Sequence, residues 1–251
     1  MIGPARIRTD EAALERVREA CPDVNVVVAY GQIIPHAVHC LPRYHSLNVH
    51  YSLLPKYRGA APVQWTVLNG DAETGVTIIE LNDRMDEGDI LAQERVAVEP
   101  RETASALEAR LAERGADLLV STLARIDDLP HIKQDDARAT LAPKIQDGRI
   151  SWSDPAVVID RKVLALADKP GVFSRIGSKR VNILRGHAVG PAGAGDAPPG
   201  MIVGISRVGL EVACGGGTAY VVEELQPEGK GVMSAHAFSL GTKIAPGDSM
   251  G

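Results

Sequence analysis

The chain has few cysteines, few aromatic residues and no long apolar run. Its three cysteines, Cys21, Cys40 and Cys214, are an odd number at unrelated spacings, which argues against a disulfide framework or a paired-cysteine zinc site. No stretch approaches the roughly 18 to 20 apolar residues of a membrane span, and residues 1–17 lack the apolar core of a signal peptide. These absences predict a cytoplasmic protein that works under reducing conditions without a membrane partner.

The remaining composition is that of an ordinary globular protein. Hydrophobic residues make up 45% and charged residues 24% of the 251 positions, which excludes a disordered or fibrous chain. Because aromatic residues are only 4%, the core must be built from Leu, Val, Ile and Ala. The length suits one or two domains.

Charge is distributed unevenly along the chain. Residues 1–142 contain 15 basic and 22 acidic residues, a balance of −7, whereas residues 143–251 contain 12 and 10, a balance of +2. This asymmetry indicates two parts with different surroundings.

The first part mixes helical and strand patterns. Residues 9–21 predict a helix capped by Thr9 or Asp10, and a long helix is expected after Thr103. Four strands are predicted, at residues 24–30, 46–51, 75–81 and 89–98. The valine-rich run at 24–30 is typical of a parallel sheet covered on both faces. The order of elements predicts an α/β layer fold.

The second part has a different texture. Periodicity is lost between about 126 and 150, which indicates a linker, and residues 156–167 predict a short helix. Short strands separated by glycine and proline then follow, and they predict a small β barrel or sandwich. The glycine-rich stretch at 188–200 fits a hairpin loop better than a phosphate site, because no strand-to-helix context surrounds it.

The second predicted strand reads SLNVHY and carries two polar side chains at alternate positions. Alternation places Asn48 and His50 on one face of the strand. An amide beside an imidazole suits attack on a carbonyl, because the amide donates to the developing oxyanion and the imidazole donates or accepts a proton. The alternative is an ordinary half-buried strand with a hydrogen-bonded histidine.

An acidic loop follows the third predicted strand. Residues 81–90 contain four carboxylates, any of which could orient the imidazole of His50: Asp83, Asp86, Glu87 and Asp89. The residues alone do not select one of the four.

Residues 48–91 read NVHYSLLPKYRGAAPVQWTVLNGDAETGVTIIELNDRMDEGDIL, and this stretch closely resembles the folate-dependent formyltransferase family. The resemblance begins at residues 22–35 and extends to the last residue. It includes APKIQDGRISW at 142–152 and ELQPEGKGVMSAHAFSLGTKIAPGD at 224–248. The second of these motifs resembles the members that formylate a transfer RNA rather than a purine precursor or an amino sugar.

The resemblance implies a reaction and a set of site residues. A formyl group would pass from 10-formyltetrahydrofolate to the α-amine of methionine on initiator tRNA, for translation initiation. The implied catalytic residues are Asn48, His50 and Asp86. The implied folate-binding residues are the loop Ser52, Leu53, Leu54 and Pro55, together with Gln32, Ile33 and Ile34, which would line the pterin pocket through backbone groups. Lys56 and Arg58 would meet the folate tail or a tRNA phosphate, or would simply be solvated.

The resemblance also implies an architecture. We expect a Rossmann-like catalytic domain at 1–142, a linker at 143–156, and an oligonucleotide-binding (OB)-like barrel at 157–251 that binds tRNA, in a monomeric protein. His36, His39 and Cys40 could suggest a metal, but no fourth ligand is evident and the family needs none, so no metal is expected.

The sequence departs from the family pattern at its start. Members carry more than a βαβ unit of about 30 residues before the segment that matches residues 22–35, whereas only one helix is predicted here. We therefore expect a catalytic domain that is incomplete at its N-terminus. Two alternatives stay open beside the tRNA enzyme, namely a formyltransferase acting on another amine and a non-catalytic protein that binds folate or RNA.

Overall fold

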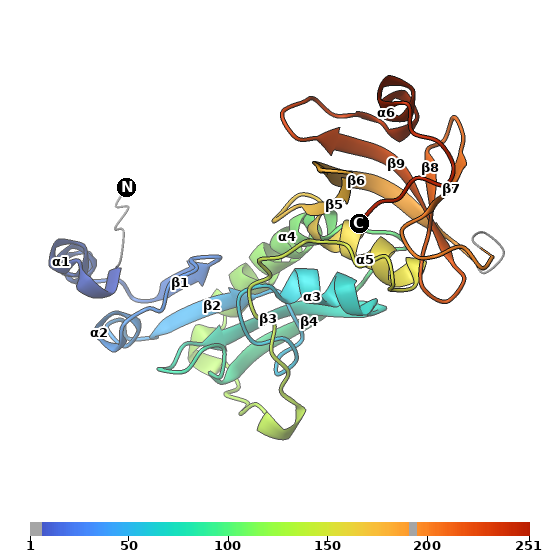
Figure 1. Ribbon diagram of the computed structural model, residues 1–251. Coiled ribbons are helices and arrows are strands. Elements are labelled where there is room, and N and C mark those ends of the chain that lie inside the picture. The colour runs from blue at the N-terminus through green and yellow to red at the C-terminus, as the bar shows by residue number, and fades with distance from the viewer. Residues whose placement is uncertain (1–6, 191–194) are drawn as a thin grey trace. The chain divides into compact units, whose positions relative to one another are not determined.

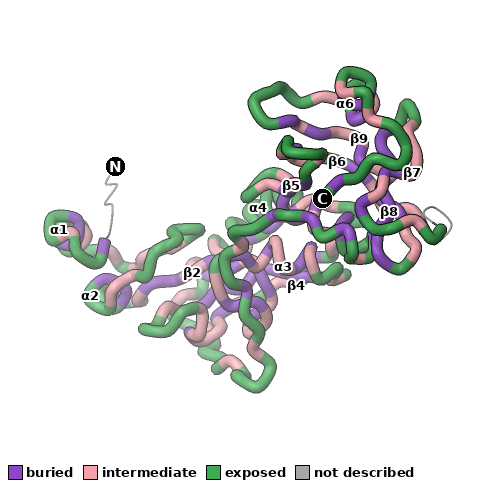
Figure 2. The backbone as a smooth tube through the Cα atoms, in the orientation of Figure 1, coloured by how far each residue is buried: buried purple, intermediate pink, exposed green. Residues whose placement is uncertain are grey.

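The computed structural model of the protein describes residues 7–190 and 195–251 (Figure 1). The chain forms two compact units. The first comprises Met1–Trp65, Asp71–Pro100 and Ala106–Lys144, and the second comprises Thr66–Gly70, Arg101–Ser105 and Ile145–Gly251. Part of the predicted hairpin loop at 188–200 lies outside the described residues. Buried residues run along strand β2 of the first unit and along β8 of the second (Figure 2).

A four-stranded sheet forms the centre of the first unit. Its strands are β1 (Asn25–Val28), β2 (Ser46–His50), β3 (Glu73–Glu80) and β4 (Ile90–Ala97), in the order β1-β2-β3-β4. The sheet is mixed, because β1 pairs with β2 in parallel whereas β2–β3 and β3–β4 are antiparallel.

The prediction that the valine-rich strand is covered on both faces is wrong for the described residues. Val26 is 43% exposed and Val28 is 44% exposed. The reason is position, because β1 is the edge strand of the sheet and pairs only with β2. The strand is therefore apolar in sequence, but it is not covered by a layer on each face as such a run usually is.

Short and long helices surround this sheet. They are α1 (Glu11–Glu19), α2 (His36–His39), α3 (Pro62–Asn69) and α4 (Ala104–Leu123), with 3₁₀ turns at Ile7–Thr9, Ile126–Asp128 and Asp136–Arg138. Asp10, one of the two predicted caps, is the N-cap of α1 and accepts a hydrogen bond from the Ala13 amide at 3.0 Å. Among the described residues no helix combines the length and the apolar composition that crossing a membrane requires.

The two faces of β2 have different surroundings. Helix α4 approaches the Val49 face so closely that a Cβ on Gly115 would lie 2.9 Å from Val49 Cγ1. Leu107 and Leu111 of α4 are fully buried, as the spacing predicts. Asn48 and His50 therefore point to the opposite face, which carries the candidate site.

The second unit is built on antiparallel strands. They are β5 (Val172–Ile176), β6 (Lys179–Val189), β7 (Ile202–Ile205), β8 (Leu210–Ala213), β9 (Ala219–Pro227) and β10 (Met233–Ser234). The sheet order is β5-β6-β9-β8-β7, and β10 pairs with β9. Helix α5 (Ala156–Leu166) matches the predicted helix to one residue, and α6 (Ala235–Thr242) follows β10.

The last residues of the chain join the two outer strands of this sheet. The Met250 amide donates to the Gly200 carbonyl at 2.8 Å, beside β7, and the Gly251 amide donates to the Arg175 carbonyl of β5 at 2.9 Å. Each outer strand thus shares its edge with the C-terminal segment, which closes the sheet in a barrel-like way. The prediction of a small β domain in this half of the chain is confirmed.

Candidate active site

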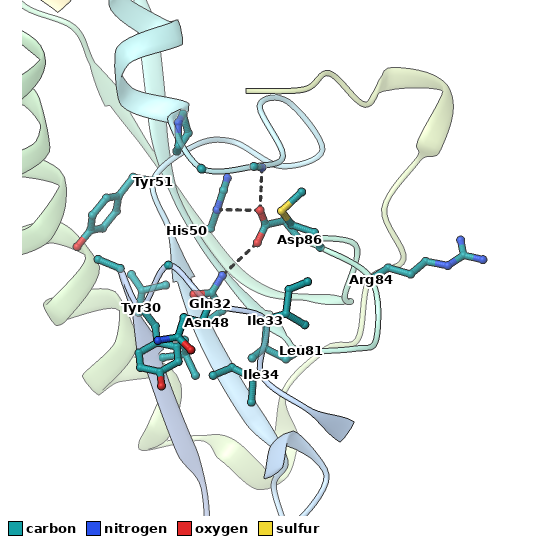
Figure 3. Close-up of a pocket in the computed structure, with 18 of the residues that line it drawn as sticks. Tyr30, Gln32, Ile33, Ile34, Asn48, His50, Tyr51, Leu81, Arg84 and Asp86 are labelled. Atoms are coloured by element: carbon teal, nitrogen blue, oxygen red, sulfur yellow. Dashed lines mark hydrogen bonds and ion pairs between the residues drawn. The ribbon is translucent and has the colours of Figure 1, made fainter. Parts of the chain in front are cut away.

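A cavity of about 410 Å³ opens beside the carboxyl end of β2. Residues from four segments and from helix α4 line it: residues 27–34 with β1, the end of β2, residues 59–64, the loop 81–86, and Glu108 of α4. Asn48, His50 and Asp86 lie together at one side of this cavity (Figure 3). The volume is within the range of about 300 to 1,000 Å³ that is typical of small-molecule sites.

Asp86 contacts both polar side chains of β2. The Asn48 amide nitrogen donates to Asp86 Oδ1 at 3.4 Å, and His50 Nδ1 lies 3.7 Å from Asp86 Oδ2. His50 is buried and Asp86 retains only 13% side-chain exposure, so water screens this pair poorly. The structure therefore brings together the three residues that the family resemblance assigns to catalysis.

Backbone groups hold Asp86 in place. Its Oδ2 accepts a hydrogen bond from the Gly59 amide at 2.8 Å, and Gln134 Nε2 donates to the carbonyls of Asp86 and Gly88 at 2.8 Å each. Asp86 has a left-handed backbone with φ of 57°, a conformation that these contacts stabilise.

Two glycines make the close approach possible. Gly59 has φ of +124°, and a Cβ there would lie 2.7 Å from the Ala142 carbonyl oxygen. A Cβ on Gly88 would lie 1.6 Å from the Glu80 carbonyl oxygen. Both positions exclude any larger residue unless the backbone moves.

The hydrogen bonds of His50 place one of its protons. Nε2 lies 2.9 Å from the Tyr57 carbonyl oxygen, which can only accept, so Nε2 carries a proton. Nδ1 is then the nitrogen that faces Asp86. The imidazole is thus held on one side by the backbone and interacts with the carboxylate on the other.

The other three acids of the loop have different partners or positions. Asp83 forms hydrogen bonds with His39 and His36. These bonds lower the pKa of its carboxyl, and the bond to His39 has the larger effect. Glu87 pairs with Arg84 and Arg58. Asp89 contributes its backbone carbonyl to the Glu80 amide.

The predicted folate-binding residues separate into two groups. Gln32, Ile33 and Ile34 line the cavity (Figure 3). The predicted loop Ser52, Leu53, Leu54 and Pro55 does not line it and instead bonds to Thr77, the residue of β3 that pairs with His50. There Ser52 is fully buried and donates to the Lys56 carbonyl at 2.6 Å, and the Leu54 amide donates to Thr77 Oγ1 at 3.2 Å.

The two basic residues after this loop are engaged within the protein. Lys56 Nζ lies 2.7 Å from Asp71 Oδ2. Arg58 is 6% exposed, and it donates to Gln134 at 3.0 Å and to Asp136 at 2.7 Å. Arg58 therefore supports the segment that carries Gln134.

Sequence reasoning missed the supporting residues Gly59, Gln134 and the Tyr57 carbonyl. Gln134 lies 48 residues from Asp86, in the segment that the lost periodicity marked as a linker. Gly59 stands in the RGAAP motif, but nothing in its spacing indicates a contact with Asp86.

The chain matches two family models. Residues 4–123 match the model described as formyl transferase, and residues 144–243 match the model of the formyl transferase C-terminal domain. The proteins it resembles include the methionyl-tRNA formyltransferase of Geotalea uraniireducens, 42% identical over 99% of this chain and 79% of the relative. Another is that of Myxococcus xanthus, 40% identical over 98% of this chain and 78% of the relative.

Solved structures share the fold. HypX from Aquifex aeolicus in complex with tetrahydrofolic acid has a TM-score of 0.68 at 18% identity, covering 90% of this chain and 40% of that one. An N-formyltransferase from Helicobacter canadensis, in complex with folinic acid and dTDP-3-aminofucose, has a TM-score of 0.57 at 20% identity, covering 70% of this chain and 66% of that one.

At such low identity these structures support the fold alone, whereas the two family models and the relatives of about 40% identity extend over nearly the whole chain. The chain therefore belongs to the formyltransferase family and, within it, groups with the methionyl-tRNA formyltransferases.

Proposed function

We propose that the protein transfers a formyl group from 10-formyltetrahydrofolate to the α-amine of methionine on initiator tRNA. The observation that carries the proposal is the convergence of Asn48, His50 and Asp86 on one side of a cavity of suitable size. The family membership and the methionyl-tRNA formyltransferases of about 40% identity support the choice of substrates.

The cavity suits the pterin end of a folate. Ile33 and Ile34 offer apolar surface, and the backbone of residues 29–34 supplies polar groups along the wall. A planar ring with several donors and acceptors would be recognised by such a mixture of apolar side chains and backbone groups. We propose that Ser52, Leu53, Leu54 and Pro55 act on folate binding indirectly, because Ser52 bonds to the carbonyl of Lys56, the residue before Tyr57, and the Tyr57 carbonyl in turn faces His50.

The residues perform distinct parts of the reaction. Attack by the methionine amine on the formyl carbon places negative charge on the formyl oxygen, and the Asn48 amide has a second N–H available for it. In its protonated form, His50 would stabilise the same oxyanion by its charge. Asp86 holds the imidazole, takes up the proton that the attacking amine releases, and passes it to the folate nitrogen as the bond between that nitrogen and the formyl carbon breaks.

The two halves of the chain have separate tasks in this proposal. Residues 1–142 hold the catalytic site, residues 143–156 connect, and residues 157–251 contact the tRNA. The positive balance of residues 143–251, with 12 basic and 10 acidic residues, is compatible with a phosphate backbone. We propose that the protein acts as a monomer in the cytoplasm, where initiator tRNA is charged.

The test is a comparison of formyl acceptors. Purified protein with 10-formyltetrahydrofolate is offered methionyl initiator tRNA, a nucleotide-linked amino sugar, and a purine-precursor amine. We expect formylation of the tRNA with a kcat/KM at least about 100-fold above that of either small amine, the discrimination that a site built for one acceptor provides.

Two results would contradict the proposal. Preferential formylation of a small amine would favour the alternative of a different acceptor, which the aminofucose-bound structural neighbour motivates. Binding of tetrahydrofolate without turnover on any of the three amines would favour a non-catalytic folate-binding protein.

A further inference from the structure

A second group of reactive side chains lies on and next to the short helix α2. His36, His39 and Cys40 place their potential ligand atoms within 4.8 Å of one another. Residues at positions i, i+3 and i+4 of a helical turn share one side, which accounts for the grouping. His39 is buried, whereas His36 and Cys40 are exposed.

Asp83 contacts the group from a distant part of the chain. Its Oδ1 lies 3.2 Å from His36 Nδ1 and 3.1 Å from His39 Nε2. Cys40 Sγ lies 3.8 Å from His36 Nδ1 and 3.2 Å from His39 Nδ1. His39 thus faces Cys40 with Nδ1 and Asp83 with Nε2, so Asp83 is a hydrogen-bond partner of His39 and does not share an ion with it. Because Asp83 is more than 40 residues away in sequence, this partner becomes visible only in the structure.

The two separations from Cys40 Sγ, 3.8 Å to His36 Nδ1 and 3.2 Å to His39 Nδ1, are close to the edges of a coordination tetrahedron. Zinc binds nitrogen and oxygen at about 2.0 to 2.2 Å and sulfur at about 2.3 Å, so neighbouring ligand atoms lie roughly 3.2 to 3.7 Å apart. We propose that His36, His39 and Cys40 form a binding site for a tetrahedral divalent transition-metal ion, with Zn²⁺ as the favoured occupant, water as the fourth ligand, and Asp83 as the carboxylate that accepts the Nε2 proton of His39. Two imidazoles and a thiolate suit Zn²⁺, whereas Mg²⁺ and Ca²⁺ take oxygen ligands.

Part of the site is held in position by neighbouring side chains. Asn25 Nδ2 donates to the Val38 carbonyl at 3.0 Å, and Ser46 Oγ donates to the His39 carbonyl at 3.1 Å. Asn25 also donates to Ser46 Oγ at 2.9 Å. Helix α2 is thereby fixed to β1 and β2, so the three ligand residues on and next to α2 are placed before an ion binds. Such outer contacts typically raise metal affinity.

The location gives the site a structural role. Asp83 lies three residues before Asp86 on the cavity-lining loop, and His36 lies two residues after Ile34 on the opposite segment. The His39–Asp83 hydrogen bond links these two segments of the cavity wall, and a bound ion would fix His39 in the orientation that makes this bond. This role does not depend on which acceptor the enzyme formylates.

The experiment uses Co²⁺ as a spectroscopic probe. The full chain is freed of metal with a chelator and titrated with Co²⁺, followed by competition with Zn²⁺. We expect saturation at one Co²⁺ per chain, visible bands of a tetrahedral centre, a near-ultraviolet band of thiolate-to-metal charge transfer, and displacement by Zn²⁺.

Two variants at exposed positions test the ligand assignment. Cys40→Ser should abolish the charge-transfer band, and His36→Ala should weaken Co²⁺ binding at least about 10-fold. Cys21→Ser is the matched control, because Cys21 is an exposed thiol outside the group, and it should leave both readouts unchanged. Thermal unfolding of each variant without metal checks that it folds.

Two outcomes would overturn the proposal. One is the absence of saturable Co²⁺ binding in the folded protein. The other is a Co²⁺ titration that is the same in Cys40→Ser, His36→Ala and Cys21→Ser. In either case the group is an imidazole–carboxylate hydrogen-bonded cluster that binds no metal.

Discussion

The two units of the chain use buried polar groups differently. In the first, Asp86 is contacted by groups 27, 36, 38 and 48 residues away in sequence, namely Gly59, His50, Asn48 and Gln134. In the second, the core is dominated by fully buried apolar side chains such as Ile183, Leu210 and Leu225. The hydroxyl of Tyr220 is buried there without a hydrogen-bond partner among the described residues.

The buried polar groups around Asp86 position side chains, whereas the apolar side chains of the second unit pack a core. A hydrogen-bonded network in a shielded cavity fixes the direction of each donor, at the cost of desolvating polar groups. An apolar core stabilises without directing any group toward a ligand. Substitutions among the residues that contact Asp86 should therefore change activity more than stability. Substitutions in the core of the second unit should change stability more than activity.

The largest effect is expected at Asn48. In Asn48→Ala the donor to the oxyanion is lost, so kcat should fall by roughly 10² to 10³-fold. The KM for 10-formyltetrahydrofolate and the melting temperature should change little, since among the described residues the amide makes one long hydrogen bond, 3.4 Å to Asp86. Steady-state kinetics and thermal unfolding check both expectations. An unaltered kcat would remove Asn48 from the catalytic group.

A smaller effect is expected at Gln134, which positions Asp86 without touching substrate. Gln134→Ala leaves the carbonyls of Asp86 and Gly88 without their donor and should lower kcat about 10-fold, with a loss of about 1 kcal/mol in the free energy of unfolding. Its exposed neighbour Lys133, substituted as Lys133→Ala, provides the control. Equal activities of the two variants would mean that the loop holds Asp86 without Gln134.

The smallest effect is expected at Tyr220 in the second unit. Burial raises the pKa of its hydroxyl, which stays protonated and lacks a partner among the described residues. Tyr220→Phe removes this group while keeping the ring, so the free energy of unfolding should change by less than about 1 kcal/mol or rise. Denaturant unfolding measures the change. A loss of more than about 2 kcal/mol would show that the hydroxyl is hydrogen bonded in solution.

Much of the fold could be predicted because local patterns determine it. The Asp10 cap, the alternation in β2 and the buried leucines of α4 are properties of neighbouring residues. Strand β5 and helix α6 were not predicted, since five and eight residues carry too little periodicity to be identified. The exposure of β1 was also missed, because it depends on the position of the strand in the sheet.

The site was predictable only in part for the same reason. Alternation alone brings Asn48 and His50 to one face, but four acids compete for the third position and only the family resemblance selects Asp86. Gly59 and Gln134 contribute through a backbone amide and a side-chain amide from distant segments. No spacing in the sequence encodes such contacts.

The most direct test of the account is the single-turnover formylation rate of Asp86→Asn on methionyl-tRNA at saturating 10-formyltetrahydrofolate. The substitution keeps the shape of the side chain and removes the charge that faces His50. The matched control is Asp89→Asn on the same loop. We predict a rate at least roughly 10²-fold below that of the unsubstituted protein for Asp86→Asn and an unchanged rate for Asp89→Asn. Equal rates in the two variants would contradict the assignment of Asn48, His50 and Asp86 as the formyl-transfer site.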